Sequence, residues 1–119
     1  MRVFQQRDVE QAIAYAAAGD QALHLHRIIA DWERAPACFK IAINKGESIA
    51  HLFDQDAQRL TKTVKRFGVK VVVIEHKGTP RQHVDLCGQP LRRAKAFAEA
   101  CAHADDDPLF KVFAGVLEG

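Results

Sequence analysis

β-Branched residues dominate positions 69–74, a short run between Gly68 and Gly78. Branching at Cβ favours extended backbone, and a short apolar run bounded by glycines is typical of a strand buried on both faces. Such strands usually lie inside a sheet that helices cover, and polar groups just beyond their carboxyl ends often form binding crevices. The pattern therefore predicts a central strand at 69–74, with a candidate site just after it.

A helix and a second strand are predicted before this run. Positions 47–67 carry apolar residues at steps of three and four, as in a one-sided amphipathic helix: Ile49, Leu52, Phe53, Ala57, Leu60, Val64 and Phe67. Positions 38–44 alternate as a strand does. Strand, helix and strand form a βαβ unit with parallel strands and a right-handed crossover. We therefore expect an α/β fold in a single domain, residues 1–119, with a small, mainly parallel sheet and helices packed on it.

The N-terminal pattern is less uniform. Val3 and Phe4 are compatible with an edge strand, and Asp8 is a suitable N-cap for a helix through Ala17. Positions 21–34 fit two structures. Leucine and histidine alternate at 23–26 as in a strand, whereas positions 25, 28, 29 and 32 form one helical stripe. The two interpretations are nearly even, and the helix is slightly favoured.

Towards the C-terminus, positions 81–88 are expected to form a polar loop. A helix is expected from Pro90 to about His103, because proline suits the first turn of a helix. A last short helix is expected after Pro108. Its apolar residues, among them Phe110, Phe113 and Leu117, would pack on the body of the protein or form a homo-oligomer.

Composition limits the possible partners. The 119 residues are 48% hydrophobic and 27% charged, as in an ordinary soluble globular protein, and the net charge of +2 is too small to require nucleic acid or an anionic membrane. No apolar run approaches membrane-spanning length, so no membrane partner is expected. Three cysteines without CxxC spacing argue against a disulfide framework and a cysteine zinc site, and favour the cytoplasm.

Glu75 and Lys77 form the first candidate site. Two residues apart on a strand, they would project to one face, as in metal-dependent nucleases that bind a divalent ion through a carboxylate and orient water with a lysine. The preceding strand at 38–44 contributes no acid, and Asp54 and Asp56 fall within the expected helix. The alternative is two solvent-facing charges where a strand leaves the core.

Arg81, His83 and Asp85 form the second candidate site, with Arg92 on the following helix. A helix N-terminus favours anions, and an arginine can bind phosphate or carboxylate through two parallel hydrogen bonds. His83 would exchange a proton near neutral pH, with Asp85 orienting its ring. The alternative is that these side chains only cap and tie the loop.

Further polar residues belong to the expected helix at 47–67, where His51, Asp54 and Gln58 would share one stripe. His24 and His26 would share a face only on a strand, and no third ligand is evident, so a metal site there is not expected. No metal ligands are assigned and no cofactor is indicated. Phosphate-binding loops, dinucleotide fingerprints and nucleophile elbows are absent from the sequence.

From residue 51 onward the chain resembles a small, uncharacterised bacterial and phage domain family. The segments that carry the resemblance are His51-Leu52-Phe53, Gly68-Val69, His83-Val84-Asp85 and Arg92-Arg93-Ala94. The chain departs from the family by having Val84 in place of a tyrosine, a longer loop before His83, and an additional N-terminal third. The resemblance implies that His51, His83 and Asp85 belong to one site, without naming its chemistry.

Gly88-Gln89-Pro90-Leu91-Arg92 is also similar to a helix start of nucleotide-sensing Rossmann-like domains, one residue off their spacing. Together these features favour a cytoplasmic α/β protein that binds or processes a phosphate-bearing ligand, a nucleotide or nucleic acid. The expected ligand contacts are Arg81, Arg92 and His51, and the expected acid–base pair is His83 and Asp85. The alternatives are a non-catalytic interaction or dimerisation module, and a metal-dependent nuclease that uses Glu75 and Lys77.

Overall fold

The computed structural model describes residues 1–26 and 49–106. These residues form an α/β fold around a four-stranded sheet in the order β1-β2-β3-β4. The elements along the chain are β1 (Arg2–Phe4), the short 3-10 helix η1 (Gln6–Asp8), α1 (Val9–Ala17), β2 (Ala22–His26), β3 (Ile49–Phe53), α3 (Ala57–Arg66), β4 (His83–Leu86) and α4 (Gly88–Asp106). β1 and β2 are parallel, whereas β2–β3 and β3–β4 are antiparallel. The α/β class is confirmed, and the sheet is mixed rather than mainly parallel.

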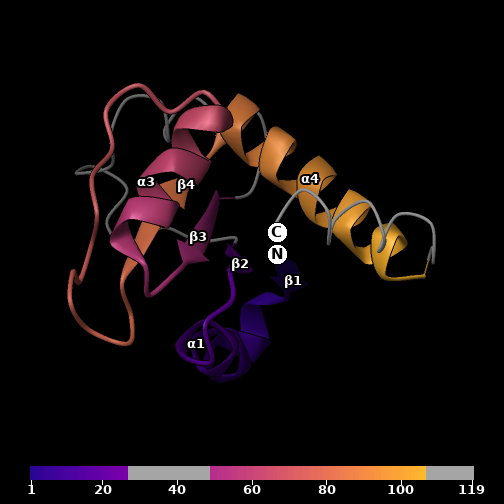
Figure 1. The fold of residues 1–119 in the computed structure, drawn as a ribbon, viewed down its shortest axis with the longest axis horizontal. Coiled ribbons are helices and arrows are strands. Elements are labelled where there is room, and N and C mark those ends of the chain that lie inside the picture. The colour runs from indigo at the N-terminus through magenta and orange to yellow at the C-terminus, as the bar shows by residue number, and fades with distance from the viewer. Residues whose placement is uncertain (27–48, 107–119) are drawn as a thin grey trace, which may run out of the picture.

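Helices cover both faces of this sheet (Figure 1). On one face, α3 and α4 close the larger core, which consists of Leu23, Ala50, Leu52, Leu60, Val64, Phe67, Val84, Leu86, Leu91 and Ala94. On the other face, α1 closes a smaller core made of Phe4, Ala12, Ala16, Ala22 and Phe53. Because successive strand residues alternate between faces, the positions between the leucines and valines of the larger core point to the α1 side. That side carries the polar residues described below.

Several predicted elements are confirmed. The N-terminal strand is present as β1, and α1 begins after Asp8, although the Asp8 side chain makes no capping hydrogen bond. α4 contains Pro90 in its first turn and passes beyond His103. The expected strand at 38–44 and the expected helix after Pro108 lie outside the described residues. Among the helices of the described residues, none has the length and apolar character needed to cross a membrane.

The predicted central strand at 69–74 is wrong. Val71 is 80% exposed and Val73 is 58% exposed, and the segment pairs with the sheet only through an isolated bridge between Glu75 and His83. A cleft of about 650 Å³, lined by these valines and by residues 84–90, separates the segment from β4. β-Propensity mainly reflects fit to a half-buried surface. Here the run meets that requirement by packing Val69, Val72 and Ile74 against the flank of the larger core.

The predicted helix at 47–67 is correct only in its second half. Ile49–Phe53 is strand β3, and the helix begins at Ala57, after Asp56 accepts a hydrogen bond from the backbone N–H of Arg59 at 3.0 Å. A short apolar run fits a helical stripe and a strand equally well, and this N-cap decides where the helix starts. The predicted βαβ crossover from this helix to 69–74 is therefore absent, since α3 connects the antiparallel strands β3 and β4.

Two further assignments are corrected in the same way. Residues 22–26 are strand β2, so the slight preference for a helix was wrong there. The expected polar loop at 81–88 contains strand β4, in which His83 and Asp85 alternate with the buried Val84 and Leu86. Their apolar neighbours were too few to stand out as a strand, although the alternation is present in the sequence.

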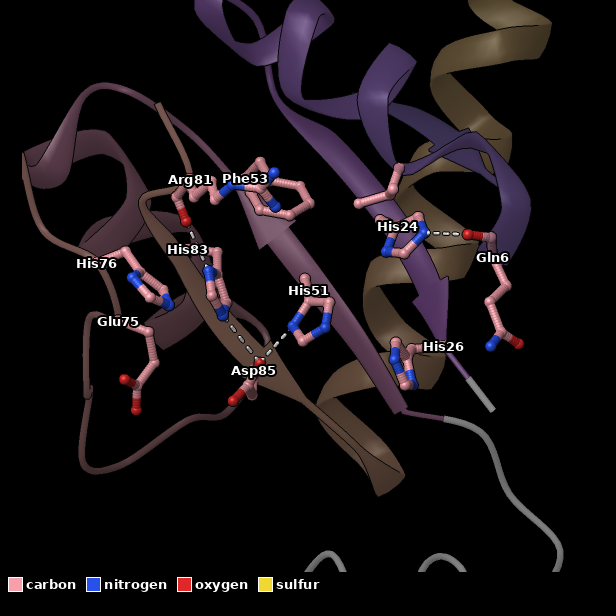
Figure 2. Close-up of a pocket in the computed structure, with 11 residues that line it drawn as sticks. Gln6, His24, His26, His51, Phe53, Glu75, His76, Arg81, His83 and Asp85 are labelled. Carbon is pink, nitrogen blue, oxygen red and sulfur yellow. Dashed lines mark hydrogen bonds and ion pairs between the residues drawn. The ribbon is translucent and has the colours of Figure 1, made fainter. Parts of the chain in front are cut away.

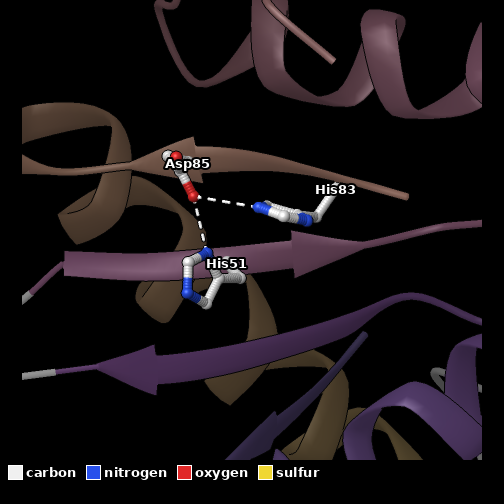
Figure 3. A group of neighbouring side chains, drawn as sticks. All are labelled: His51, His83 and Asp85. Carbon is white, nitrogen blue, oxygen red and sulfur yellow. Dashed lines mark hydrogen bonds and ion pairs between the residues drawn. The ribbon is translucent and has the colours of Figure 1, made fainter. Parts of the chain in front are cut away.

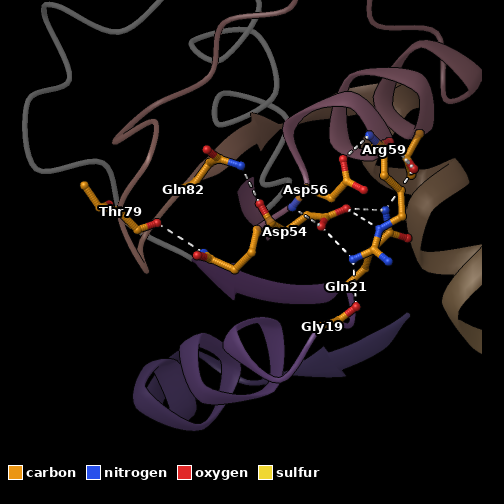
Figure 4. Close-up of polar contacts among 9 residues, drawn as sticks. Gly19, Gln21, Asp54, Asp56, Arg59, Thr79 and Gln82 are labelled. Carbon is orange, nitrogen blue, oxygen red and sulfur yellow. Dashed lines mark hydrogen bonds and ion pairs between the residues drawn. The ribbon is translucent and has the colours of Figure 1, made fainter.

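Asp54 fixes the turn between β3 and α3 (Figure 4). Its carboxylate is fully buried and accepts hydrogen bonds from Nε and Nη2 of Arg59 at 2.8 and 2.7 Å, from Nε2 of Gln21 at 2.9 Å and from the backbone N–H of Asp56 at 2.9 Å. Its backbone carbonyl accepts from Nε2 of Gln82 at 2.8 Å. A buried carboxylate is tolerated when its oxygens are satisfied in this way. Asp54 thus joins β3, α3 and the segment that precedes β4.

A histidine-rich pocket as candidate functional site

Strand register brings polar side chains into one row across the sheet. His24 on β2 is paired with His51 on β3, and His51 is paired with Asp85 on β4. Residues directly opposite each other in a ladder project to the same face, so all three side chains lie on the α1 side of the sheet. The next row adds His83 of β4, which is opposite Phe53. Three strands therefore present a polar surface beside the smaller core.

This surface is the floor of a pocket of about 550 Å³, here called the histidine pocket (Figure 2). Its lining consists of Gln6, Val9, His24, His26, His51, Phe53, Glu75, His76, Arg81, His83 and Asp85. Five of the six histidines in the chain are in this list. These five histidines are spread over 60 residues of the sequence, from His24 to His83. The strands and the turn before β4 bring them together in one pocket.

Asp85 lies between the imidazoles of His51 and His83 (Figure 3). Its Oδ1 is 2.5 Å from Nδ1 of His51 and 3.3 Å from Nε2 of His83. The other ring nitrogen of His83, Nδ1, donates to the backbone carbonyl of Arg81 at 2.6 Å. His83 is thus held at both nitrogens, and its ring is oriented by its own strand and by the turn before it.

These contacts shift the ionisation of the pair. Burial by itself raises the pKa of Asp85, but the hydrogen bonds from His51 and His83 outweigh it and hold that pKa well below its usual value. Burial by itself lowers the pKa of His83, but hydrogen bonds to Asp85 and to the Arg81 carbonyl outweigh it, so that the pKa is raised above 6.5. Asp85 is therefore a carboxylate, and His83 is protonated more readily than a free histidine.

His24 is buried with one unsatisfied nitrogen. Its exposed fraction is 2%, and its Nε2 lies 2.9 Å from the backbone carbonyl of Gln6. A carbonyl only accepts, so Nε2 carries the proton and Nδ1 has a free lone pair. Among the buried side-chain nitrogen and oxygen atoms of the described residues, only this Nδ1 lacks a hydrogen-bond partner. Leaving such an atom unpaired costs about 1–3 kcal/mol, so the native state benefits when something in the pocket donates to it.

The remaining imidazoles are close to this row. The ring of His24 is stacked on that of His51, with centroids 5.8 Å apart, and His26 meets His51 edge-on at 5.3 Å. Burial lowers the pKa of His26, and repulsion from His51 and His24 lowers it further. His26 therefore favours the neutral imidazole, which is able to accept a hydrogen bond or bind a metal.

Charged groups line the opposite rim. Arg81 is exposed and lies 3.5 Å from Oε1 of the exposed Glu10, a surface pair of low strength. Glu75 and His76 lie on the turn before Arg81, and His76 has a left-handed backbone with φ of 51°. Non-glycine residues in that region cost energy and are concentrated in turns and functional sites.

None of the protein-family models, curated proteins or solved structures compared with this chain matches it. The site is therefore interpreted from its own geometry.

The structure brings together most of the residues that the sequence proposed. His51, His83 and Asp85 form one cluster, and Glu75 and Arg81 line the same pocket. Two others are placed elsewhere. Arg92 lies on the exposed side of α4, where its Nε donates to Gln89 at 3.1 Å, and Lys77 is exposed in the turn after Glu75. Neither lines the histidine pocket.

The predicted polar stripe of His51, Asp54 and Gln58 is wrong, because these residues are on different elements. His51 is on β3, Asp54 follows that strand as a structural anchor, and Gln58 is on α3. The shared face predicted for Glu75 and Lys77 required extended backbone to continue past the predicted strand at 69–74, and the chain turns after Glu75 instead.

Sequence reasoning did not place His24, His26, His76 and Phe53 in the site. A signal for the first two was present, since histidines two apart with leucines between them share one face of a strand. It pointed to a site only in combination with β3 and β4, whose strands were not recognised. The exposed turn at His76 carried no signal of its own.

The assembled groups allow two kinds of chemistry. His83 and Asp85 form an acid–base pair within a pocket that is large enough for a small ligand. Alternatively, imidazole and carboxylate atoms at this spacing are metal ligands. Both use His83 and Asp85, and a metal site would also use His51.

Proposed function

We propose that the histidine pocket binds and processes a phosphate-bearing ligand, a nucleotide or a nucleic-acid end. The single observation that supports this most is the position of the His51–Asp85–His83 cluster on the floor of a pocket whose rim carries Arg81. The cluster supplies proton donors and acceptors, and the arginine supplies a charge-assisted contact for a phosphate. The pocket volume of about 550 Å³ is in the range of small-molecule sites.

Arg81 is suited to be the anion contact. The side chain of Arg81 is 57% exposed, and that of its partner Glu10 is more exposed still, so a ligand can replace that weak pair at little cost. Its backbone carbonyl holds His83, which links the anion contact and the acid–base pair in one short segment. A phosphate bound to Arg81 would therefore lie near the imidazole of His83.

His83 would serve as the proton donor of the pair. Its raised pKa makes the protonated form more populated than in a free histidine, and Asp85 stabilises the imidazolium. Asp85 itself remains ionised, because His51 and His83 both hydrogen-bond to its carboxylate. His51 would orient Asp85 from the neighbouring strand. The pair thus has the arrangement needed to protonate a leaving oxygen.

The decisive experiment is isothermal titration of the protein with phosphorylated compounds and their dephosphorylated counterparts, namely nucleotides against nucleosides and 5′-phosphorylated against unphosphorylated short oligonucleotides. We expect a preference for the phosphorylated member, and Arg81→Gln should weaken its binding by about 10- to 100-fold, as expected for loss of a hydrogen bond to a charged group. Arg92→Gln is the matched control, because Arg92 is an exposed arginine on α4 that does not line the histidine pocket. Equal binding of both members of each pair would contradict the proposal.

The alternative of an interaction or dimerisation module stays a prediction, since Phe110, Phe113 and Leu117 lie outside the described residues. The alternative of a nuclease that uses Glu75 and Lys77 has less support, because Glu75 lines the pocket and Lys77 does not. We also propose a cytoplasmic location, which is supported by Cys101, a cysteine outside any disulfide.

A further inference from the structure

Three potential metal ligands converge in the histidine pocket. One donor atom each from His51, His83 and Asp85 lies within 4.8 Å of the other two. In a tetrahedral site with metal–ligand bonds of about 2.0–2.1 Å, neighbouring donor atoms are about 3.3 Å apart. The observed separations of 2.5 and 3.3 Å from Asp85 Oδ1 to the two imidazoles already approach that spacing. Side-chain adjustments of about an ångström would admit an ion between them.

The surroundings of His83 are those of a metal-binding histidine. A ligating imidazole usually donates its second ring N–H to a carboxylate or a backbone carbonyl, which fixes the tautomer and the ring orientation. Nδ1 of His83 makes this bond to the Arg81 carbonyl, and Nε2 is left facing Asp85. The ligands are also carried by β3 and β4, two paired strands, rather than by flexible termini. The site is thus oriented before any ion arrives.

A second, independent observation concerns His24. Its buried Nδ1 has a lone pair and lacks a donor, and its ring is stacked on His51. His24 is not within the group of converging ligands. A water molecule on an open coordination position of an ion held by His51 could donate to this nitrogen. The unsatisfied nitrogen is thus an acceptor available to a hydrogen-bond donor inside the pocket.

We propose that His51, His83 and Asp85 bind one divalent transition-metal ion, and that His24 accepts a hydrogen bond from a water molecule on that ion. Two imidazoles and one carboxylate suit Zn²⁺, Co²⁺, Ni²⁺ and Fe²⁺, whereas Mg²⁺ and Ca²⁺ prefer oxygen ligands alone. Three protein ligands leave at least one position open for water or for an oxygen of a ligand. The inference does not depend on the phosphate proposal. Because Nδ1 of His83 is held by the Arg81 carbonyl, an ion would replace the proton on Nε2, so a bound ion excludes the proton-donor role of His83 while Arg81 keeps its role as the anion contact.

The test is a titration of the full chain, first treated with a chelator that is then removed, with Co²⁺ followed by visible absorption and with Zn²⁺ in competition. We expect one ion per chain in the wild type, and a loss of affinity of more than about 100-fold in His51→Gln and in Asp85→Asn. His76→Gln, in the pocket wall, and His103→Gln, outside the pocket, are the matched controls and should bind like the wild type. Mg²⁺ should not compete.

The proposal is overturned if the wild type binds neither Co²⁺ nor Zn²⁺ stoichiometrically, or if His51→Gln and Asp85→Asn bind as tightly as the two controls. Should a glutamine variant fail to fold, Asp85→Asn preserves shape, and the Zn²⁺-dependent rise in melting temperature of the wild type should be absent from it. His24→Phe should retain the ion; loss of the ion in this variant would contradict the assigned role of His24. Ion binding without any preference for phosphorylated ligands would refute only the proposed function.

Discussion

His51 and Asp85 face each other across the β3–β4 ladder, and Nδ1 of His51 lies 2.5 Å from Oδ1 of Asp85. Direct opposition in a ladder gives two side chains a fixed separation that neither can leave without moving a strand. The same carboxylate oxygen also faces Nε2 of His83, on its own strand. One aspartate therefore couples two imidazoles, and its removal should affect the ionisation and the stability of the whole cluster.

Replacing Asp85 with asparagine should destabilise the metal-free protein in a pH-dependent manner. The pKa of Asp85 is lowered from 3.8, so its contribution is present above that value and is lost as the pH falls below it. The pKa of His83 is raised from 6.5, so its contribution is complete below 6.5 and is lost as the pH rises through its folded-state value. The two contributions overlap between pH 3.8 and 6.5.

Urea unfolding of wild type and Asp85→Asn, with chelator present, measures this effect. The variant should lose about 2 kcal/mol at about pH 5, and less at about pH 8.5, where His83 is less protonated. His26 is present in both proteins, so its own titration largely cancels in the difference. A difference that is constant from about pH 5 to about pH 8.5 would contradict the coupling between Asp85 and His83.

His26 and His83 should titrate on opposite sides of the ordinary histidine value. The pKa of His26 is lowered by burial and by repulsion from His51 and His24, whereas the hydrogen bonds of His83 raise its pKa. NMR titration of the imidazole Cε1–H signals gives each value directly, with His26→Gln and His83→Gln used for assignment. We expect His26 to titrate below 6.5 and His83 above it. The reverse order would show that the cluster is organised differently.

The buried carboxylate of Asp54 should be far more important for stability than the neighbouring Asp56. Asp54→Ala leaves donors on Arg59 and Gln21 and the N–H of Asp56 unpaired, which should cost about 3 kcal/mol of unfolding free energy. Asp56→Ala removes only the helix cap, worth about 1 kcal/mol. Chemical denaturation of both variants compares them, and equal losses would mean that the Arg59–Asp54 pair contributes little beyond capping.

The sequence supported the fold class better than the position of the strands. Asp8 and Pro90 are local signals that act within one or two turns, and the helices that begin at them were correctly placed. Strand assignments depend on partners far away in the chain. Residues 49–53 and 83–86 become strands because they pair with each other, and nothing in either segment alone shows that partner.

The candidate site was predicted in part for the same reason. The resemblance joined His51, His83 and Asp85 without a geometry, and the structure supplies one through strand register. Arg92 was favoured by its place after a helix start, yet the orientation of α4 directs it away from the histidine pocket. His24 required knowledge that β2 pairs with β3, which is a long-range property of the fold.

The exposed valines of the β-branched run at 69–74 provide a last test. If residues 69–74 formed a buried strand, Val71→Thr and Val73→Thr would each introduce a buried hydroxyl and lose apolar contacts. With Val71 80% exposed and Val73 58% exposed, the double variant should instead change the unfolding free energy by no more than about 0.5 kcal/mol.

Val84→Thr is the matched control, because Val84 is 3% exposed in the larger core, and a hydroxyl buried there without a partner should cost about 1–3 kcal/mol. Unfolding in urea under identical conditions distinguishes the two sites. If the double variant at Val71 and Val73 lost as much unfolding free energy as Val84→Thr, residues 69–74 would have to be a buried strand, contrary to the structure. A near-neutral double variant would leave residues 69–74 as a cover on the core flank, with the edge of β4 open beside it.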